Sequence, residues 1–563
     1  MKKLLILLCL LLPMQAFAAD TDEIRDHFPI TDEKQALLEA LYEADIASIR
    51  EAIDLGLITC RELTEYYLER IEAYEDTFHC FITLCDNALE EADKRDAAIA
   101  NGSAEGLLFG IPIVVKDNID YEGYPTTNGY WCYKSAPSES ATVVQNLLDE
   151  GAVILGKTNM SAGAQDAICS VSDLGIETFN AYNPELASGG SSGGSASAVS
   201  LNLAVAGLGT DTNVSLRYPS ALNGCVSMRP TVGLLDRDGC VILNYSRDTP
   251  GAITRTVKDQ AIMLDVMTGG ETSYAENLDA SALEGMRIGV LWELSYPIAN
   301  SYDRKESDLD EEILTAFENT VSEFIACGAD IKVISIPEVF NYSASDGGGT
   351  YLREQVNTKL EAVFEENEIS ALIFPSYLHT PDYNVTEHST PAGGYAYICN
   401  CAKLSPIAGV PEITIPIGVH SRGAGIGMEI LSLKNSEQLL LDIAYSYSEQ
   451  YNRRQAPETA PSLYDSNQEE TLSAYIARYQ QEQTRAQALT VMATANLETK
   501  HQNDAAEFYV SEDTAFDFAS IPTTNESSGK PAFTLWVILP LLAIGTHAAL
   551  LLHRRRRHGN LIK

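Results

Sequence analysis

Short apolar runs and amphipathic helical stretches alternate along most of this chain. Residues 109–115 and 152–155 are apolar runs bounded by glycine, which is typical of buried strands. Behind a capping box, the apolar positions Leu63, Tyr67 and Ile71 recur at helical spacing. Strands that alternate with helices predict an α/β fold, with a β-sheet core covered by helices on both faces.

The same alternation continues to about residue 454. An acidic helical stretch over residues 308–327 precedes an apolar run at 331–336, and strand-like runs follow at 371–375 and 412–416. Beyond residue 454, prolines and polar residues replace the apolar runs. We therefore expect one large folded domain over residues 19–455.

The segment from residue 456 to residue 530 has a different composition. Its first part predicts one helix, which would either pack on the domain or mediate pairing through a single apolar stripe: Leu472, Tyr475, Ile476 and Tyr479. Residues 499–530 are acidic and rich in serine and threonine. We expect a stalk over residues 456–530, helical at first and flexible afterwards.

Both ends of the chain carry apolar runs of another kind. Residues 1–18 combine two lysines, an apolar run and the small residues Ala16 and Ala18, which predicts a cleaved signal peptide, with a membrane anchor as the alternative. Residues 531–552 could cross a bilayer as a C-terminal transmembrane helix, and four arginines lie in the tail 553–563; a buried core helix is the alternative. Together these runs predict a single-pass cell-membrane protein with its domain outside and a basic cytoplasmic tail.

The net charge of −41 narrows the classes of function. Nucleic acids are bound by basic surfaces, so we expect no nucleic-acid partner, and the ordinary effect of such a charge is solubility. The sequence has no H-E-x-x-H motif, and Cys399 and Cys401 have no second cysteine pair nearby. We therefore expect neither a metal nor a cofactor.

Candidate chemistry lies in three stretches of the chain. Residues 189–195 place hydroxyl groups in a glycine-rich loop that a ligand can approach closely. Ser215 stands between Asp211 and Arg217, which we expect to form a buried pair that braces the loop. Lys116 ends an apolar run. Two serines and a lysine together indicate a hydrolase that activates serine without histidine.

These stretches, in this order, resemble the amidase signature family of serine hydrolases from about residue 59 to about residue 450. The resemblance implies an amidase-signature mixed β-sheet core. It also implies that a carboxamide, either a small molecule or a peptide amide, is hydrolysed through an acyl-enzyme. The motifs that carry it include Gly110-Ile-Pro-x-x-Val-Lys-Asp-Asn118, Gly151-Ala-x-x-x-Gly-Lys-Thr-Asn-Met160, Gly189-Gly-Ser-Ser-Gly-Gly-Ser-Ala196, Gly209-Thr-Asp-x-x-x-Ser-x-Arg-x-Pro219 and Val410-Pro-x-x-x-x-Pro-Ile-Gly418.

The resemblance assigns a role to each of three residues. Ser215 resembles the nucleophile, Ser191 the bridging serine that relays the proton, and Lys116 the general base. In the family the bridging serine follows a cis peptide bond, here Gly190–Ser191. Because lysine accepts a proton only when it is neutral, burial in its apolar strand must lower the pKa of Lys116.

The oxyanion donors of the family correspond here to the backbone N–H groups of Thr212, Asn213 and Val214. The family has Gly-Gly where this chain has Asn213 and Val214. A β-branched residue is strained at positive φ, and both side chains would narrow the acyl pocket, so we expect altered specificity. Asn159 either lines the pocket or caps backbone groups.

Two other interpretations stay open. Residues 189–193 also fit G-x-S-x-G, the nucleophile elbow of α/β-hydrolases, with a downstream histidine as base; Lys116 would then have no role. A catalytically impaired amidase fold that acts as a surface binding protein is the non-enzyme alternative, supported only by Asn213 and Val214. The identity of the amide and the oligomeric state are left open.

Overall fold

The structure, a computed structural model, describes residues 32–132, 135–296, 310–341, 349–380, 399–464 and 470–487. Residues up to Gln483 belong to one compact unit, and Thr484–Lys563 belong to a second.

The strands of the first unit are β1 (Phe81–Leu84), β2 (Pro112–Lys116), β3 (Val153–Thr158), β4 (Ser170–Val171), β5 (Glu177–Thr178), β6 (Ala206–Asp211), β7 (Val226–Arg229), β8 (Thr249–Thr254), β9 (Arg287–Leu291), β10 (Asp330–Ile334), β11 (Ala371–Pro375), β12 (Glu412–Val419) and β13 (Gly425–Leu431). Its α-helices are α2 (Asp32–Ala40), α3 (Ile46–Asp54), α4 (Cys60–Phe78), α5 (Ala88–Asn101), α6 (Thr142–Asp149), α7 (Gly193–Ser200), α8 (Arg217–Leu222), α9 (Val257–Met267), α10 (Trp292–Ser295), α11 (Glu311–Ala326), α12 (Gly349–Asn367), α13 (Ser405–Ala408) and α14 (Glu437–Ser448).

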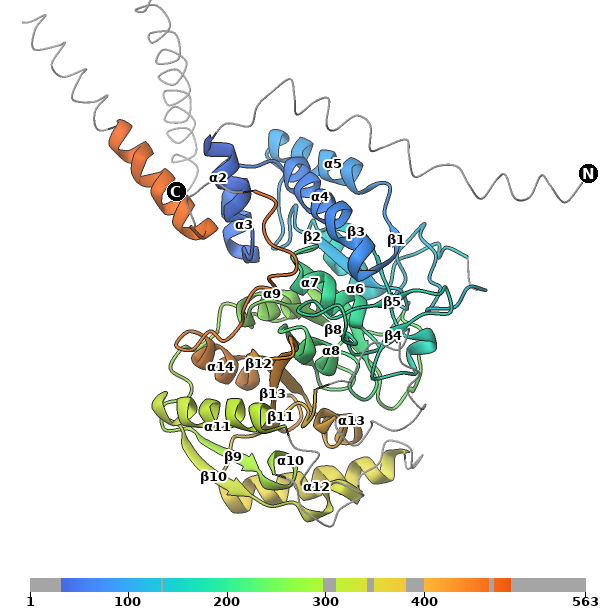
Figure 1. The fold of residues 1–563 in the computed structure, drawn as a ribbon, viewed down its shortest axis with the longest axis vertical. Helices are drawn as coiled ribbons and strands as arrows, with labels where there is room; N and C mark the ends of the chain where they lie inside the picture. Colours follow the sequence, from blue (N-terminus) through green and yellow to red (C-terminus); the bar gives the residue numbers. More distant parts are fainter. Residues whose placement is uncertain are drawn as a thin grey trace, which may run out of the picture. The chain divides into compact units, whose positions relative to one another are not determined.

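Within the described residues, eleven strands form one mixed sheet in the order β1-β3-β2-β6-β8-β7-β12-β13-β11-β9-β10 (Figure 1). β2 is parallel to both of its neighbours, β3 and β6. β6, β8, β7, β12, β13 and β11 then follow one another as antiparallel pairs, and β9 is parallel to β11 and β10. The carboxyl ends of β3, β2 and β6 therefore meet at one edge of the sheet, where α/β proteins place their ligands.

Helices cover both faces of this sheet, as the sequence pattern predicts. On β11, Ala371 and Ile373 join the main hydrophobic core together with residues of α11. Leu372 and Phe374, which point to the other face, join a second core with residues of α12. In Figure 1, α11 and α12 accordingly lie on either side of β9 and β10. The mixed α/β class is therefore confirmed.

The predicted helix near residue 60 is present as α4. The Thr59 hydroxyl accepts a hydrogen bond from the Glu62 N–H, and the Glu62 carboxylate accepts one from the Thr59 N–H, so the capping box is formed. Leu63, Tyr67 and Ile71 are buried on one face of the helix. The periodicity of apolar residues thus located this helix and its buried face.

Residues after 455 begin by packing on the same unit. The Arg70 guanidinium donates hydrogen bonds of 2.9 Å to the carbonyl groups of both Ala460 and Pro461. Leu472, Tyr475 and Ile476, on a helix that begins at residue 472, are buried in the main core. The apolar stripe of the predicted stalk helix is therefore used for packing on the domain.

The C-terminal transmembrane helix is the part of the fold prediction that is wrong. No helix in the described part of the chain is long and apolar enough to cross a membrane. The two longest described helices, α4 and α12, have 19 residues each and carry charged side chains along their length. The predicted signal peptide 1–18, membrane helix 531–552 and tail 553–563 lie outside the described residues. The predicted cell-membrane location depended on that helix and is withdrawn with it.

Candidate active site

Lys116, Ser191, Thr210 and Asn118 form one buried polar cluster, the lysine cluster. The Lys116 Nζ donates to Ser191 Oγ at 2.7 Å and to Thr210 Oγ1 at 2.9 Å. The Asn118 side-chain amide donates to the same Thr210 hydroxyl at 3.0 Å. Lys116 ends β2 and Thr210 lies near the end of β6, so the parallel pairing of these strands brings the two side chains together. The predicted base and bridging serine are thus in direct contact.

The lysine cluster is an unusual environment for an ammonium group. The Lys116 side chain is fully buried, and both of its hydrogen-bond partners are neutral hydroxyls. Burial lowers the pKa of Lys116 from its ordinary 10.5 to about 7, and the attraction of Asp211 and Asp248 opposes this shift without cancelling it. A large fraction of Lys116 is therefore neutral near pH 7 and able to accept a proton.

The loop that carries Ser191 comes close to the neighbouring backbone. The Gly190–Ser191 peptide bond is cis, as the resemblance predicts. A Cβ added at Gly190 would lie 2.5 Å from the Asp166 carbonyl oxygen and 2.6 Å from that of Cys169, so only glycine fits there. Gly193, two residues after Ser191, begins α7.

Ser215 lies between the end of β6 and the start of α8, in a turn that is nearly closed to solvent. The residue is 7% exposed. Its carbonyl oxygen accepts a hydrogen bond of 3.3 Å from the N–H of Ser192, the residue after the bridging serine. The Ser192 hydroxyl in turn donates to the Thr210 carbonyl at 3.3 Å. These contacts hold the two serine loops side by side, and Ser192 acts as a loop hydrogen-bonder.

The segment Thr212–Val214 takes an unstrained path to Ser215. Neither Asn213 nor Val214 has positive φ, so the strain considered for a β-branched residue does not arise. Among the described residues, none accepts a hydrogen bond from the backbone N–H of Asn213 or Val214. Thr212 Oγ1 donates to Asp248 at 2.6 Å, and the Val214 side chain is buried in the main core. Within the described chain, two backbone donors beside Ser215 are therefore unoccupied.

Asp211 and Arg217 form the buried pair expected around Ser215, and a second arginine joins them. Asp211 accepts hydrogen bonds from Arg217 Nε at 3.1 Å, from Arg229 Nη1 at 2.9 Å and from the Leu216 N–H at 3.2 Å. Burial raises the pKa of the Asp211 carboxyl, but the two guanidinium groups outweigh burial and hold the pKa below its ordinary value. Arg217 Nη2 also donates to the Asn213 carbonyl at 2.6 Å, which ties the segment before Ser215 to this pair.

The geometry of Asn159 favours the backbone-capping alternative. Its fully buried side-chain amide donates to the Ser170 carbonyl at 3.1 Å and to Thr178 Oγ1 at 3.0 Å. These partners belong to the two-stranded β4–β5 sheet, which Asn159 fastens to the end of β3. Thr210 and Asn118, by contrast, were not singled out from the sequence, although both stand inside the motifs that contain Lys116 and Ser215.

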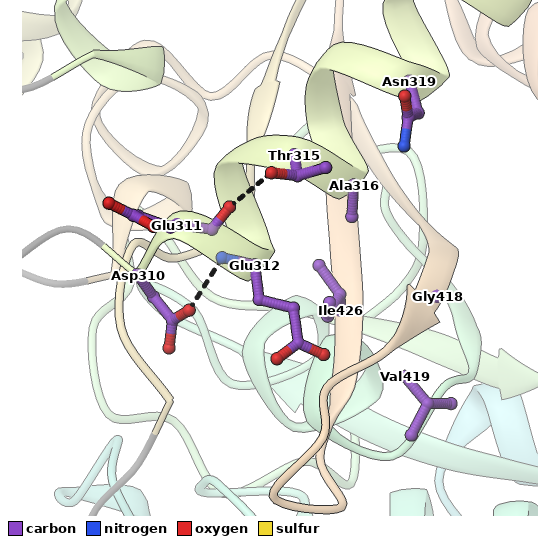
Figure 2. A pocket seen from close by; sticks show the side chains of 9 residues that line it. All are labelled: Asp310, Glu311, Glu312, Thr315, Ala316, Asn319, Gly418, Val419 and Ile426. Atoms are coloured by element: carbon purple, nitrogen blue, oxygen red, sulfur yellow. Dashed lines mark hydrogen bonds between the residues drawn. The ribbon is translucent and has the colours of Figure 1, made fainter.

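The described histidines give no base to the Gly-Ser loop. His79 Nδ1 contacts the Glu177 carbonyl at 3.3 Å, His379 Nδ1 contacts the Thr380 carbonyl, and His420 Nε2 pairs with Asp310 at 2.9 Å. His388 lies outside the described residues. Figure 2 shows Asp310 beside Glu311 and Glu312 on an acidic cavity of about 660 Å³, and no predicted site residue lines it. Within the described residues, no group of three or more His, Cys, Asp and Glu side chains is arranged to hold a metal. Of the two serine-hydrolase interpretations, the geometry favours the lysine-based one.

Comparison with known proteins adds an independent finding. The chain matches the family model described as Amidase over residues 62–347, a range that includes Lys116, Ser191 and Ser215. A glutamyl-tRNA(Gln) amidotransferase subunit from Gloeothece citriformis is 30% identical over 463 residues, which cover 70% of this chain and 95% of that protein. Mandelamide hydrolase of Pseudomonas putida is 29% identical over 493 residues, which cover 74% and 93%. Among solved structures, native peptide amidase from Stenotrophomonas maltophilia matches with a TM-score of 0.62 at 26% identity, covering 74% of this chain and 99% of that one.

Proposed function

Because this chain belongs to the amidase family and is an amide-hydrolysing enzyme, we propose that it cleaves a carboxamide C–N bond through an acyl-enzyme on Ser215. Ser191 is the proton relay and Lys116 the general base. The observation that supports this proposal best is the fully buried Lys116 Nζ, 2.7 Å from Ser191 Oγ, with a pKa of about 7. A base of that pKa is matched to catalysis near neutral pH.

The first half of the reaction forms the acyl-enzyme. Neutral Lys116 takes the Ser191 hydroxyl proton, while Ser191 takes the proton of Ser215 and the Ser215 oxygen attacks the amide carbon. The carbonyl oxygen becomes an oxyanion, which the free N–H groups of Asn213 and Val214 stabilise. The C–N bond then breaks as Ser191 gives a proton to the leaving nitrogen and regains one from Lys116. Ammonia or an amine leaves.

The second half hydrolyses the ester on Ser215. A water molecule passes one proton through Ser191 to Lys116 and attacks the acyl carbon, and the same N–H groups stabilise the second oxyanion. Collapse returns a proton to the Ser215 oxygen and releases a carboxylic acid. Every proton that Lys116 accepts is returned within the same half-reaction, so the cycle needs no metal or cofactor.

A small-molecule amide or a peptide amide is the substrate class that we propose. Two similar proteins are named for such activities, a mandelamide hydrolase and a peptide amidase. The amidotransferase relative is named for glutamyl-tRNA. A net charge of −41 opposes binding of a polyanion such as tRNA, so we do not extend that activity to this chain.

The test is covalent labelling of the full-length chain with a fluorophosphonate, followed by mass spectrometry of its peptides. We expect a single adduct on Ser215 in the wild type and none in Ser215→Ala. We also expect Ser215→Ala to lower kcat on a panel of carboxamides by about 10⁴-fold or more, with an unchanged circular dichroism spectrum. An adduct on another serine, or none on the folded wild type, would contradict the proposal and favour the binding-protein alternative.

A further inference from the structure

Two glutamates lie side by side on the neighbouring strands β12 and β13 of the sheet. Thr414 of β12 is paired with Glu429 of β13, and Glu412 with Leu431, so Glu412 and Glu429 are diagonal neighbours on one face. Glu412 is also paired with Arg229 of the adjacent strand β7. Both glutamates are fully buried. Charged side chains on the inner face of a sheet need partners, because an isolated buried charge is very costly.

Hydrogen bonds reach only half of the carboxylate oxygen atoms of the two glutamates. Arg217 Nη1 donates to Glu412 Oε1, and Thr414 Oγ1 donates to Glu429 Oε1 at 2.5 Å. The Oε2 atoms of both glutamates are buried and have no hydrogen-bond partner among the described residues. The two carboxyl groups are diagonal neighbours on one face of the sheet, and Arg217 Nη1, which donates to Glu412, also lies 3.8 Å from Glu429 Oε2. Two ionised carboxylates can only accept hydrogen bonds and repel each other, so a proton on one of them removes this repulsion and supplies a donor.

Charge balance leads to the same conclusion. The charged cluster consists of Asp211, Arg217, Arg229, Glu412 and Glu429, which are all fully buried. Arg217 and Arg229 contribute two positive charges and Asp211 one negative charge, so one further negative charge makes the cluster neutral. Burial raises the pKa of Glu412 well above its ordinary value, and the neighbouring Glu429 adds to this shift against the opposing effect of Arg217. The Cys401 thiol beside Arg217 is also kept neutral, because burial raises its pKa.

We propose that Glu412 and Glu429 share one proton and together act as a single-charge counterion for Arg217. Arg217 connects this pair to the site, since its Nη2 donates to the Asn213 carbonyl at 2.6 Å and its Nε to Asp211. Glu412 and Glu429 are thus positioning residues: they hold the guanidinium that fixes the turn from Asp211 to Ser215. This role rests on the proposed function of Ser215 and of the N–H groups beside it.

The test compares Glu412→Gln, Glu429→Gln and the double variant in the full-length chain. A glutamine replaces the protonated partner without changing the charge, so each single variant should keep kcat within about twofold of the wild type. The double variant leaves Asp211 as the one carboxylate of the charged cluster for both Arg217 and Arg229, so one positive charge is uncompensated. We expect kcat and the rate of fluorophosphonate labelling to fall about tenfold or more. KM should change by less than about twofold, because the pair does not touch substrate. The matched control is Glu412→Gln with Glu437→Gln, which makes the same number of changes but leaves Glu429 charged.

Infrared difference spectroscopy at about pH 8 observes the proton directly, at a pH where an ordinary carboxyl is ionised. When the spectrum of Glu412→Gln is subtracted from that of the wild type, the difference should contain the C=O band of a protonated carboxyl. The same band should remain when the spectrum of Glu429→Gln is subtracted. If the double variant does not fold by circular dichroism, this band and the two single variants still decide the matter. Absence of the band, a tenfold loss in either single variant, or wild-type kcat in the double variant would overturn the shared proton.

These outcomes are separate from those that test the proposed function. If the wild type takes no fluorophosphonate on Ser215, the proposed nucleophile is wrong, whereas the infrared band still reports on the pair. If the wild type is labelled at Ser215 and the band is missing, only the role of Glu412 and Glu429 fails.

Discussion

The lysine cluster and the charged cluster begin at neighbouring residues of β6 and differ in how their charges are paired. Thr210 belongs to the lysine cluster, where the hydrogen-bond partners of the Lys116 ammonium are neutral hydroxyls. Asp211 belongs to the charged cluster, where Arg217 and Arg229 each contact a carboxylate. Lys116 and Arg217 are both fully buried. Similar burial therefore surrounds two cations with different partners.

This difference decides what each cation can do. Burial lowers the pKa of Lys116 to about 7, since the more distant carboxylates Asp211 and Asp248 oppose this shift only in part. Burial also acts against the charge of Arg217, but Asp211 and Glu412 outweigh it and raise the pKa well above its ordinary value. Lys116, whose direct partners are hydroxyls, can therefore act as a base, whereas Arg217, which has two carboxylate partners, stays charged and holds the backbone in place.

The largest expected effect tests the base. Lys116→Met keeps most of the side-chain volume and removes the proton acceptor, so we expect kcat to fall about 10³-fold. The stability should not decrease, because the variant removes an amine that burial destabilises when it is charged. Steady-state kinetics on carboxamides and thermal unfolding measure both quantities. Activity within tenfold of the wild type would remove Lys116 from the mechanism.

Lys157→Met is the matched control for this variant. Lys157 is the other buried lysine at this sheet edge, on β3, and its Nζ lies 3.8 Å from Asp117 and 3.3 Å from the Pro125 carbonyl. Its loss leaves the buried Asp117 without its cation, which should cost about 3 kcal/mol of stability. The folded variant should keep kcat within about fivefold, since Lys157 contacts neither serine. The two lysines thus separate a chemical role from a structural one.

The next effect is a pH dependence. Lys116 acts as a base only when neutral, so the rate should rise with pH up to the pKa of about 7 and be level above it. Below the pKa, each further decrease of one pH unit lowers the neutral fraction of Lys116, and with it the rate, about tenfold. The rate of fluorophosphonate labelling at Ser215 measures this without an amide substrate. A flat profile across the acid range would show that Lys116 is not the titrating base.

A smaller effect is expected at Thr210, which orients Lys116. Thr210→Val removes the hydroxyl that accepts from both Lys116 and Asn118, so we expect about a tenfold decrease in kcat with little change in KM. The hydroxyl stabilises the charged ammonium, and its loss should move the acid limb of the pH profile to lower pH. Thr210→Ser keeps the hydroxyl and should restore both. An unchanged profile in Thr210→Val would mean that Ser191 alone positions the lysine.

The sequence predicted the lysine cluster better than the charged cluster. The catalytic assignments came from ordered motifs, and the structure places Lys116 and Ser191 in contact. Apolar runs located the strands because a strand that is buried on both faces is apolar at successive positions, as at 371–375 for β11. The transmembrane helix, inferred from an apolar run and the arginines that follow it, is the wrong part of the prediction, since no helix among the described residues could cross a membrane.

The charged cluster depends on information that a linear pattern lacks. Glu412 and Glu429 each stand alone within a strand-like run, where a charge has no evident partner. Only the β12–β13 register and the position of α8 bring them to Arg217. Thr210 was missed for the same reason, since its contact with Lys116 requires the parallel pairing of β2 and β6. Asn159 stayed ambiguous until the position of the β4–β5 sheet was known.

The smallest expected effect concerns the segment that joins the two clusters, where adjacent side chains have different surroundings. Asn213→Gly keeps the backbone donor and the carbonyl that Arg217 holds, and it loses only a 3.4 Å contact between its Oδ1 and Arg247. We expect kcat within about threefold and a modestly wider range of amides, since a weak contact contributes ~0.5 kcal/mol. Val214→Ala instead removes methyl groups from the main core and should cost about 1–2 kcal/mol of stability. Kinetics on a carboxamide panel and thermal unfolding separate the two variants. Inactivation by Asn213→Gly would show that the Asn213 side chain shapes the oxyanion site, in addition to the hydrogen bond from Arg217 to the Asn213 carbonyl.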